Sequence, residues 1–595
     1  MTDTIVDGKV QRVQVMLYAK ASKEPAVQFK RLYKYLTKLE WAEAAADQVI
    51  RNRGSRTAGI DGKTRDDYLA ADKQTELVQE IREELKTQTY HPDPVRQTYI
   101  PKANGQKRPL GISTIKDRVV QQMVKMLLEP IYEAIFLPCS YGFRPHRCTW
   151  DALAEAYKFL TASCQYYTII EGDIENCFGS LHHGVLMHQL RRHILDKRLL
   201  ALIWQMLRAG VLDNLQYHET MVGSPQGSIV SPVLANVYLH RLDEWFHQRF
   251  HAMTPDERYR RRRKGEFVSV RYIRYCDDFI VMLRDSEKAP QLKEELAQYI
   301  DQELKMTLND EKTTIVHAKE GFDFLGVRTF IAPQRSNPTR ILPYHIPSRK
   351  SIQSYRQKVK ELTHSSLDCL PPGERIRALN WLISGWANYH RWGNAKQTFS
   401  NLSQWTIKKV HRMLRRYTPK GKNATYRKYF RPLSECTNLR QWKRYTNWHT
   451  VSVKVDEDVR LGILPMSIIS TSQYWQYRGS KIPPAYQLLN EEVQWNEIDT
   501  EFNTDIEVIE KTALGRASRW TKSKYDVAYF HNRKIALQRD QYTCTECGYK
   551  SQRQKGEVHD LETHHINPDG GNNVDNLQTV CIPCHQQLTA IRQAD

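Results

Sequence analysis

The sequence predicts a multidomain protein of the α+β class, with a sheet-containing part, a helical part and a small metal-binding part. Two strand-like runs, at residues 166–171 and 268–283, alternate β-branched and aromatic side chains and contain or lead into acidic residues. Helical segments follow between residues 350 and 417, and four cysteines near the C-terminus form two Cys-x-x-Cys pairs. At 595 residues, the chain is long enough to fold into several domains.

The charge balance predicts a nucleic-acid partner. Lys and Arg number 88 against 67 Asp and Glu, which gives a net charge of +21, and 10% of the residues are aromatic. This excess of cations suits a polyanion. A basic structural protein would share the charge but not the acidic residues at the ends of strands.

The composition also predicts where the protein works. No stretch approaches about 18 consecutive apolar residues, and the first residues lack the order of a signal peptide or a transit peptide. We therefore expect a soluble, cytoplasmic protein without a membrane partner, and a bacterial origin is favoured over an organellar one.

The chain is organised around residues 268–283, in which two apolar runs flank Tyr-Cys-Asp-Asp in the pattern of a β-hairpin. The adjacent carboxylates of Asp277 and Asp278 repel each other and suggest a divalent cation such as Mg²⁺. An isolated Asp pair would equally suit a turn. However, strand 166–171 leads into Asp173, and sheet neighbours could bring Asp173 beside Asp277 to make a two-metal site for nucleotidyl transfer.

The Tyr-Cys-Asp-Asp motif, with Asp173 and an aromatic residue five positions later, resembles the palm of reverse transcriptases. The flanking blocks resemble group II intron-encoded proteins, called maturases, over nearly the whole chain. The resemblance implies a right-hand polymerase that copies RNA into DNA, with Asp173, Asp277 and Asp278 holding two Mg²⁺ ions. It also implies that Phe178 lies under the sugar and selects deoxynucleotides; a core aromatic is the alternative.

The resemblance implies a nucleotide pocket formed with the fingers. Residues 99–112 read as a hairpin with an Asn-Gly tip and resemble the fingers hairpin that closes over the incoming nucleotide. Lys102 and Arg108 are expected to contact the triphosphate, and Lys107 is an alternative. Gln226, in a polar turn, is expected to line the pocket.

Several basic features predict contacts with template or intron RNA. Arg144 lies in a block whose family counterpart follows the template, and residues 258–264 place six cations in seven positions, although a solvated loop is the alternative. Proline-rich residues 331–347 predict a linker, and the three helices after it resemble the family's thumb, called domain X, with residues 385–392 resembling its signature. The expected RNA-binding residues are Arg261, Arg262, Lys408, Lys409, Arg412, Arg415 and Arg416.

The paired cysteines predict a structural zinc site, because two knuckles supply four thiolates for a tetrahedral Zn²⁺. The ligands would be Cys544, Cys547, Cys581 and Cys584.

The residues within and beside this cysteine framework resemble an HNH nuclease, in which a strand pair and a helix surround one metal ion. The resemblance implies that His565 is the general base. It also implies that His564 and His585 hold Mg²⁺ or a similar ion, while Asn576 braces the His565 loop. The alternative ligands are His559 and Asp560. A zinc finger that binds DNA without cutting it is the alternative for the whole domain.

Together with these features, the resemblance implies a group II intron maturase that binds intron RNA, assists splicing and inserts the intron into DNA by target-primed reverse transcription. The HNH domain would nick the second DNA strand, and the palm would extend that end with dNTPs. The alternatives are a splicing cofactor that only binds RNA, and a reverse transcriptase of a non-intron retroelement or defence system. The expected domains are a helical, basic extension of the fingers at 1–95, fingers and palm at 96–330, thumb at 331–440, a DNA-binding segment at 441–525 and the HNH domain at 526–595.

Overall fold

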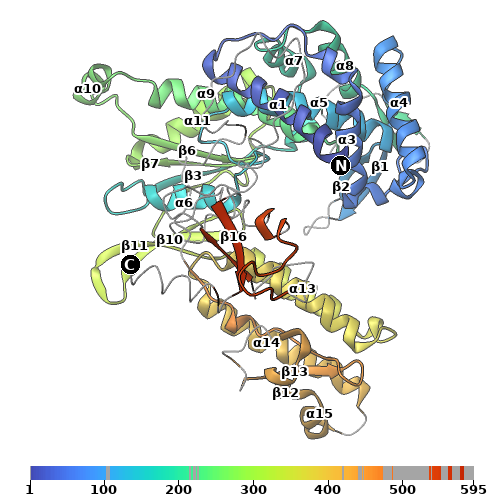
Figure 1. The fold of residues 1–595 in the computed structure, drawn as a ribbon. Helices are drawn as coiled ribbons and strands as arrows, with labels where there is room; N and C mark the ends of the chain where they lie inside the picture. The colour runs from blue at the N-terminus through green and yellow to red at the C-terminus, as the bar shows by residue number, and fades with distance from the viewer. Residues whose placement is uncertain are drawn as a thin grey trace, which may run out of the picture.

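The computed structural model in Figure 1 places two large bodies and a smaller C-terminal strand pair. It describes residues 2–101, 107–213, 216–218, 223, 227–418, 421–439, 445, 448–472, 486, 535–537, 539–550, 561–565, 576–581 and 584. Within these ranges, no helix combines the length and hydropathy needed to span a membrane.

The N-terminal helices share one hydrophobic core with the helices of the following domain. The N-terminal helices are α1 (Thr2–Lys23), α2 (Tyr33–Leu36), α3 (Leu39–Arg51) and α4 (Ala71–Thr87), and the first helix of the following domain is α5 (Ile115–Ile135). Helices α1 and α3 pack on α5, and the indole Nε1 of Trp41 donates a hydrogen bond of 3.0 Å to the carbonyl of Met123. Val120, Met123 and Leu127 are fully buried, as the apolar stripe of this helix predicts.

The central sheet of the first body is antiparallel and has the strand order β6-β7-β3-β8. Its strands are β3 (Thr168–Asp173), β6 (Val270–Tyr275), β7 (Asp278–Leu283) and β8 (Ile315–His317). Alternate residues of β7 enter two different cores: Phe279 and Val281 join the core that includes the N-terminal helices, and Ile280 and Met282 join a second core with α6 (Thr149–Phe159). Burial of both faces explains the nearly continuous apolar runs of these strands.

A second sheet has the order β2-β1-β4-β5. Its strands are β1 (Val95–Pro101), β2 (Lys107–Ile112), β4 (Val211–Asp213) and β5 (Gln216–His218). Strands β1 and β2 form the antiparallel pair that the Asn-Gly tip predicts. The other helices of this body are α7 (His183–Arg191), α8 (Lys197–Leu207), α9 (Ser231–Phe246), the π-helix η4 (His247–His251), α10 (Pro255–Arg263) and α11 (Ala289–Leu304).

The proline-rich segment expected to be a linker is instead part of a three-stranded sheet, so that expectation was wrong. Strands β9 (Phe322–Phe324), β10 (Val327–Gln334) and β11 (Asn337–Pro347) lie in the order β11-β10-β9. Three prolines lie in β11, which is an edge strand, where a missing backbone N–H costs little. The boundary expected at residue 330 consequently falls inside β10.

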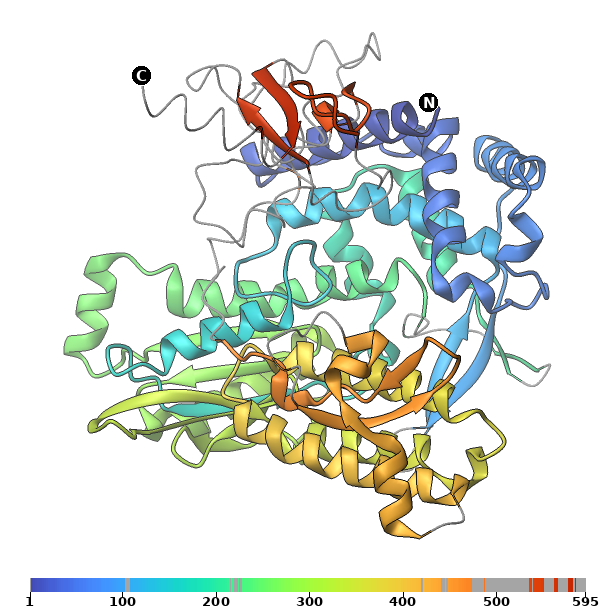
Figure 2. The same cartoon turned by 60° about the horizontal axis from the view of Figure 1, so that its bottom comes forward.

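The second body is built around three helices and a small sheet, seen from below in Figure 2. Its elements are α12 (Arg349–Leu362), α13 (Pro372–His390), α14 (Lys396–Leu414), α15 (Lys422–Tyr429), β12 (Phe430–Pro432), β13 (His449–Lys454) and β14 (Arg460–Gly462). Val451, Val453 and Ile463 are buried in the same core as the helices. The boundary expected at residue 440 therefore lies inside this body, whose core extends to Ile469.

Candidate active site and metal centre

The sheet register brings three aspartates to one end of the central sheet. Asp173, the last residue of β3, lies opposite Asp278, the first residue of β7. Tyr275 also pairs with Asp278, which leaves Cys276 and Asp277 as the two-residue turn between β6 and β7. The sequence had suggested Asp277 as the neighbour of Asp173; the register makes Asp278 that neighbour and places Asp277 at the adjoining tip.

The turn between β6 and β7, which we propose as the catalytic turn, is held by a buried arginine that the sequence reasoning missed. Arg274 and Asp243 are both fully buried, and two hydrogen bonds of 2.8 and 2.6 Å join the guanidinium to the carboxylate. Arg274 also donates to the carbonyl of Cys276 at 3.0 Å and to Ser140 Oγ at 2.8 Å. Because Cys276 has a φ of +59°, a strained value for a residue with a side chain, the turn needs this support.

The segment at residues 140–145 packs beneath the turn. A Cβ built on Gly142 would lie 2.3 Å from Cys276 Sγ and 2.4 Å from its backbone nitrogen, so only glycine allows this approach. The expectation that Arg144 lies along the template was wrong. Its buried guanidinium makes two hydrogen bonds of 2.8 Å to Glu133 and donates to the carbonyls of Leu137 and Ser140.

The three carboxylates create an excess of negative charge. Burial, and then the charges of Asp277 and Asp173, raise the pKa of Asp278 to about 6, against the opposing effect of Lys312. Lys312 Nζ lies 2.5 Å from Asp173 Oδ2, and this hydrogen bond raises the pKa of the lysine. Lys312 lies 139 positions from its partner, so no local motif could have identified it.

This charge pattern fits divalent cations bound by Asp173, Asp277 and Asp278. Carboxylate oxygens are preferred ligands of Mg²⁺, and a bound cation would offset the repulsion that raises the pKa of Asp278. Lys312 now supplies a positive charge beside Asp173, which a bound cation would supply in its place.

The raised pKa gives a stability prediction for Asp278→Asn. An acid whose folded-state pKa is raised destabilises the fold increasingly as the pH rises from its unfolded-state pKa to its folded-state pKa, and fully above the latter, because it must then be ionised among other carboxylates. Asp278 is exposed at the start of β7, so solvent screens part of this repulsion, and the destabilisation is smaller than the shift in pKa from 3.8 to about 6 alone would give. We expect the metal-free variant to unfold at a higher temperature than the wild type at about pH 7.5 and to lose much of this gain by about pH 5.

The matched control for this prediction is Asp310→Asn, which removes an exposed carboxylate from the loop that carries Lys312. It should show no comparable pH-dependent gain. Destabilisation of Asp278→Asn at neutral pH would contradict the charge repulsion inferred for the site.

The expected nucleotide-pocket residues are only partly described. Phe178 lies in η3 (Cys177–Ser180), directly beyond Asp173, with its ring centroid 6.1 Å from that of Phe143. Phe143 was not identified from sequence, yet it is 46% exposed and has a φ of +57°. Lys102 and Gln226 lie outside the described residues, and Arg108 is placed in β2 without a described side chain.

The basic residues expected to bind RNA differ in their surroundings. Residues 255–263 form helix α10 rather than a loop, and Arg261 pairs with Glu257 at 2.7 Å; the side chain of Arg262 is not described. Lys408, Arg412 and Arg415 are exposed, at or just after the end of α14.

The two remaining basic residues of this region are engaged within the protein. Lys409 Nζ lies 5.5 Å from the centroid of the Trp405 ring. Arg416 makes two hydrogen bonds, of 2.6 and 2.7 Å, to Asp368, which hold the pKa of that carboxyl well below its usual range. Arg416 therefore ties the end of α14 to the loop after α12, which limits its availability to RNA.

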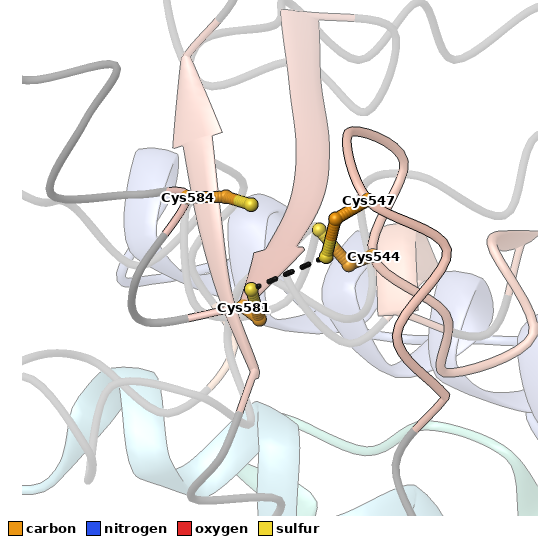
Figure 3. A group of neighbouring side chains, drawn as sticks. All are labelled: Cys544, Cys547, Cys581 and Cys584. Carbon is orange, nitrogen blue, oxygen red and sulfur yellow. Dashed lines mark hydrogen bonds between the residues drawn. The ribbon is translucent and has the colours of Figure 1, made fainter.

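The four C-terminal cysteines converge on one point (Figure 3). Their sulfur atoms all lie within 4.8 Å of one another, and Cys547 Sγ lies 3.6 Å from Cys581 Sγ. Tetrahedral zinc with bonds of about 2.3 Å separates its sulfurs by about 3.8 Å, so this arrangement fits zinc. Burial raises the pKa of the Cys544 thiol, but hydrogen bonds from the backbone of Cys547, Cys581 and Glu546 outweigh it and lower the pKa to about 7, which favours a thiolate.

The cysteine group is attached to an antiparallel strand pair. Strands β15 (Leu561–His565) and β16 (Leu577–Cys581) place His564 opposite Gln578 and His565 opposite Leu577. Asn576 directly precedes β16, so its backbone lies next to the His565 end of the pair. The side chains of His564 and His565 are not described, and His559, Asp560 and His585 lie outside the described residues.

Comparisons with known proteins identify two regions of the chain. Residues 100–329 match the family described as reverse transcriptase (RNA-dependent DNA polymerase), and residues 352–430 match the group II intron, maturase-specific domain. Both matches end before the four-cysteine group.

Curated relatives are similar to parts of the chain. Protein YkfC of Escherichia coli is 34% identical over 359 residues, which cover 58% of this chain and 93% of YkfC. The group II intron-encoded protein LtrA of Lactococcus lactis is 34% identical over 420 residues, which cover 61% of this chain and 66% of LtrA. Nuclear intron maturase 2 of Arabidopsis thaliana is 25% identical over 273 residues, which cover 35% of this chain and 37% of that protein.

Proposed function

Because the chain belongs to the group II intron-encoded reverse transcriptases and maturases, we propose that it binds its own intron RNA, assists splicing and inserts the intron into DNA by target-primed reverse transcription. The observation that carries this proposal is the register of β3 and β7, which brings Asp173, Asp277 and Asp278 to one end of the sheet. A protein that only binds RNA would not need three mutually repelling carboxylates there.

In the proposed polymerase site, the three aspartates would hold two Mg²⁺ ions, and bound ions of this kind would supply activation of a 3′ hydroxyl and neutralisation of the triphosphate. The chain's own residues supply selection and positioning. Phe178 lies beneath the sugar and leaves no room for a 2′ hydroxyl, while Lys102 and Arg108 neutralise the triphosphate and Gln226 lines the pocket.

Intron RNA is the proposed partner of the thumb and of α10. Lys408, Arg412 and Arg415 form an exposed basic end of α14, and Arg261 and Arg262 belong to the basic helix α10. Phosphate contacts of this kind give affinity without reading sequence, which suits a protein that recognises a folded RNA.

The C-terminal strand pair is proposed to be an HNH nuclease that nicks the second DNA strand. His565 takes the proton from the attacking water, His564 and His585 hold one Mg²⁺ or similar ion, and Asn576 braces the His565 loop. Zinc on the four cysteines is a scaffold for this domain. A nick made by the same chain would supply the primer that the polymerase needs.

The proposal is tested by combining the protein, its intron RNA and a DNA duplex that carries the insertion site. We expect a nick in one strand and DNA synthesis from that nick, both dependent on Mg²⁺ and the RNA. Extension of a supplied primer without any nick would leave the polymerase in place and remove the nuclease from the proposal.

For the nuclease, His565→Ala is expected to stop nicking while RNA-templated extension of a supplied primer continues. The general base contributes about 100- to 10,000-fold to such reactions, and the polymerase aspartates lie in a different domain. His559→Ala is the matched control and should still nick. If His565→Ala nicks normally and His559→Ala does not, the general base is His559.

A further inference from the structure

Two adjoining open cavities form a groove on the first body, away from the catalytic turn. They measure about 290 and 190 Å³, and His251 and Arg271 line both. The larger lies between α6, the end of α9 and β6, and the smaller between β6, α10 and the residue after β7. Arg271 stands near the start of β6, about 13 Å along the strand from Tyr275, the last residue before the turn that carries Asp277. We call these two cavities the palm groove.

The larger cavity has aromatic walls. Phe159, Phe246 and Tyr272 line it, together with the exposed side chains of Lys158 and His247. Its lining also includes two acids, Glu155 and Asp243, and Asp243 is neutralised by its buried ion pair with Arg274. Its volume is at the lower end of the range for small-ligand sites, which begins at about 300 Å³. The cavity therefore accommodates one base-sized planar group but not a nucleic-acid duplex.

The smaller cavity is cationic. Arg258, Arg271 and Arg284 line it, and none of its lining residues within the described part of the chain is acidic. The guanidinium carbons of Arg271 and Arg284 lie 5.5 and 5.0 Å from the centroid of the Tyr166 ring. Arg271 Nε is buried and has no hydrogen-bond partner among the described residues. A phosphate would satisfy these donors, because guanidinium groups match its geometry.

The boundary between the cavities is built by a π-helix. Residues His247–His251 continue α9 with π-helical hydrogen bonding, and this places both terminal histidines on the lining of the larger cavity. Arg271 Nη1 and His251 Nδ1 lie 3.1 Å apart; burial, followed by the charge of Arg271, lowers the pKa of His251 to about 4, so the neutral imidazole accepts this hydrogen bond. Single π-helical turns are rare and occur frequently at functional sites.

We propose that the palm groove binds single-stranded RNA, with one phosphate among Arg258, Arg271 and Arg284 and the adjoining base in the aromatic cavity. Basic grooves interleaved with aromatic rings are the usual way in which proteins hold single strands. The basic helix α10 continues the positive surface beyond Arg258. An acidic protein segment would use the arginines but would have no use for a flat aromatic cavity beside them. The inference rests on the proposed function, which supplies RNA as the partner.

The test uses the full-length protein and an oligouridine of about eight nucleotides that carries a photoreactive base. We expect crosslinks to peptides that contain residues 157–166 or 246–251, because these segments line the groove. A sugar-phosphate chain of the same length without bases should compete about 10-fold less well for these crosslinks, as base stacking in such sites is worth 1–3 kcal/mol.

The variant Arg258→Gln/Arg284→Gln removes two exposed cations and leaves the buried walls intact. We expect it to reduce the groove crosslinks about 10-fold, and to lower the salt dependence of binding by about 0.7 per lost phosphate contact. Arg335→Gln/Arg340→Gln removes the same charge from exposed positions on the β10–β11 hairpin and should leave the groove crosslinks unchanged.

The outcomes separate this inference from the proposed function. If the wild type copies an RNA template but gives no groove crosslink, or if both double variants lower the crosslink equally, the palm groove is not an RNA site. If the sugar-phosphate chain without bases competes as well as the oligouridine, the groove binds only phosphate, and the proposed base-binding role of the aromatic cavity is wrong. Absence of RNA-templated synthesis by the wild type would instead count against the proposed function.

Discussion

Asp277→Ala is expected to lower RNA-templated DNA synthesis by about 1,000-fold or more, while binding of intron RNA stays within about twofold of the wild type. Metal ions at such a site supply several kcal/mol of transition-state stabilisation, and each 1.4 kcal/mol is tenfold in rate. Asp277 lies at the tip between β6 and β7, next to the Asp173–Asp278 pair, and we propose it as a metal ligand that neither neighbour can replace. Primer extension on an RNA template with dNTPs and Mg²⁺ measures the effect.

The matched control is Asp310→Ala, which removes an exposed acid from the loop of Lys312 without touching the strand ends. It should extend the primer at close to the wild-type rate. Retention of synthesis by Asp277→Ala would exclude this turn as the metal site. Loss of RNA binding by the same variant would show that the catalytic turn and the RNA-binding surfaces are not separable.

Strong local patterns were sufficient to predict much of the fold. Alternation of side chains identified β3 and the β6–β7 hairpin to within two residues, and the helices expected between residues 350 and 417 correspond to the three long helices of the second body. The prolines at residues 331–347 led to the wrong prediction of a linker. The destabilisation that a proline causes in a sheet depends on whether its strand lies at an edge, as β11 does. The order of strands cannot be read from one segment of sequence.

Site residues that belong to one short motif were predicted from the sequence. Residues that reach the site through partners distant in sequence were missed. Asp277 and Asp278 were evident, but Lys312 reaches Asp173 across 139 positions, and Arg274 finds Asp243 across 31. Arg144 shows the opposite error, because a basic residue in a recognised block was assigned to nucleic acid although Glu133 neutralises it. Charge alone does not reveal whether its partner lies inside the protein.

Arg274→Gln is expected to destabilise the first body by about 3–5 kcal/mol, the usual cost of leaving one member of a buried ion pair without its partner. Arg274 and Asp243 are fully buried, so the abandoned carboxylate has no access to water. The comparison variant is Arg241→Gln, which breaks a partly exposed ion pair with Glu303 whose closest atoms lie 2.7 Å apart. We expect it to lower the free energy of unfolding by less than about 1 kcal/mol. Thermal unfolding of the two variants measures the difference.

A double variant separates stability from the support of the catalytic turn. Arg274→Met/Asp243→Leu removes both charges together, and replacing a buried ion pair by apolar residues is often neutral for stability or better. It still lacks the donors to the Cys276 carbonyl and Ser140 Oγ, so the strained turn that carries Asp277 loses its support. We therefore expect thermal stability to recover while DNA synthesis stays reduced; recovery of both would show that Arg274 serves the core alone.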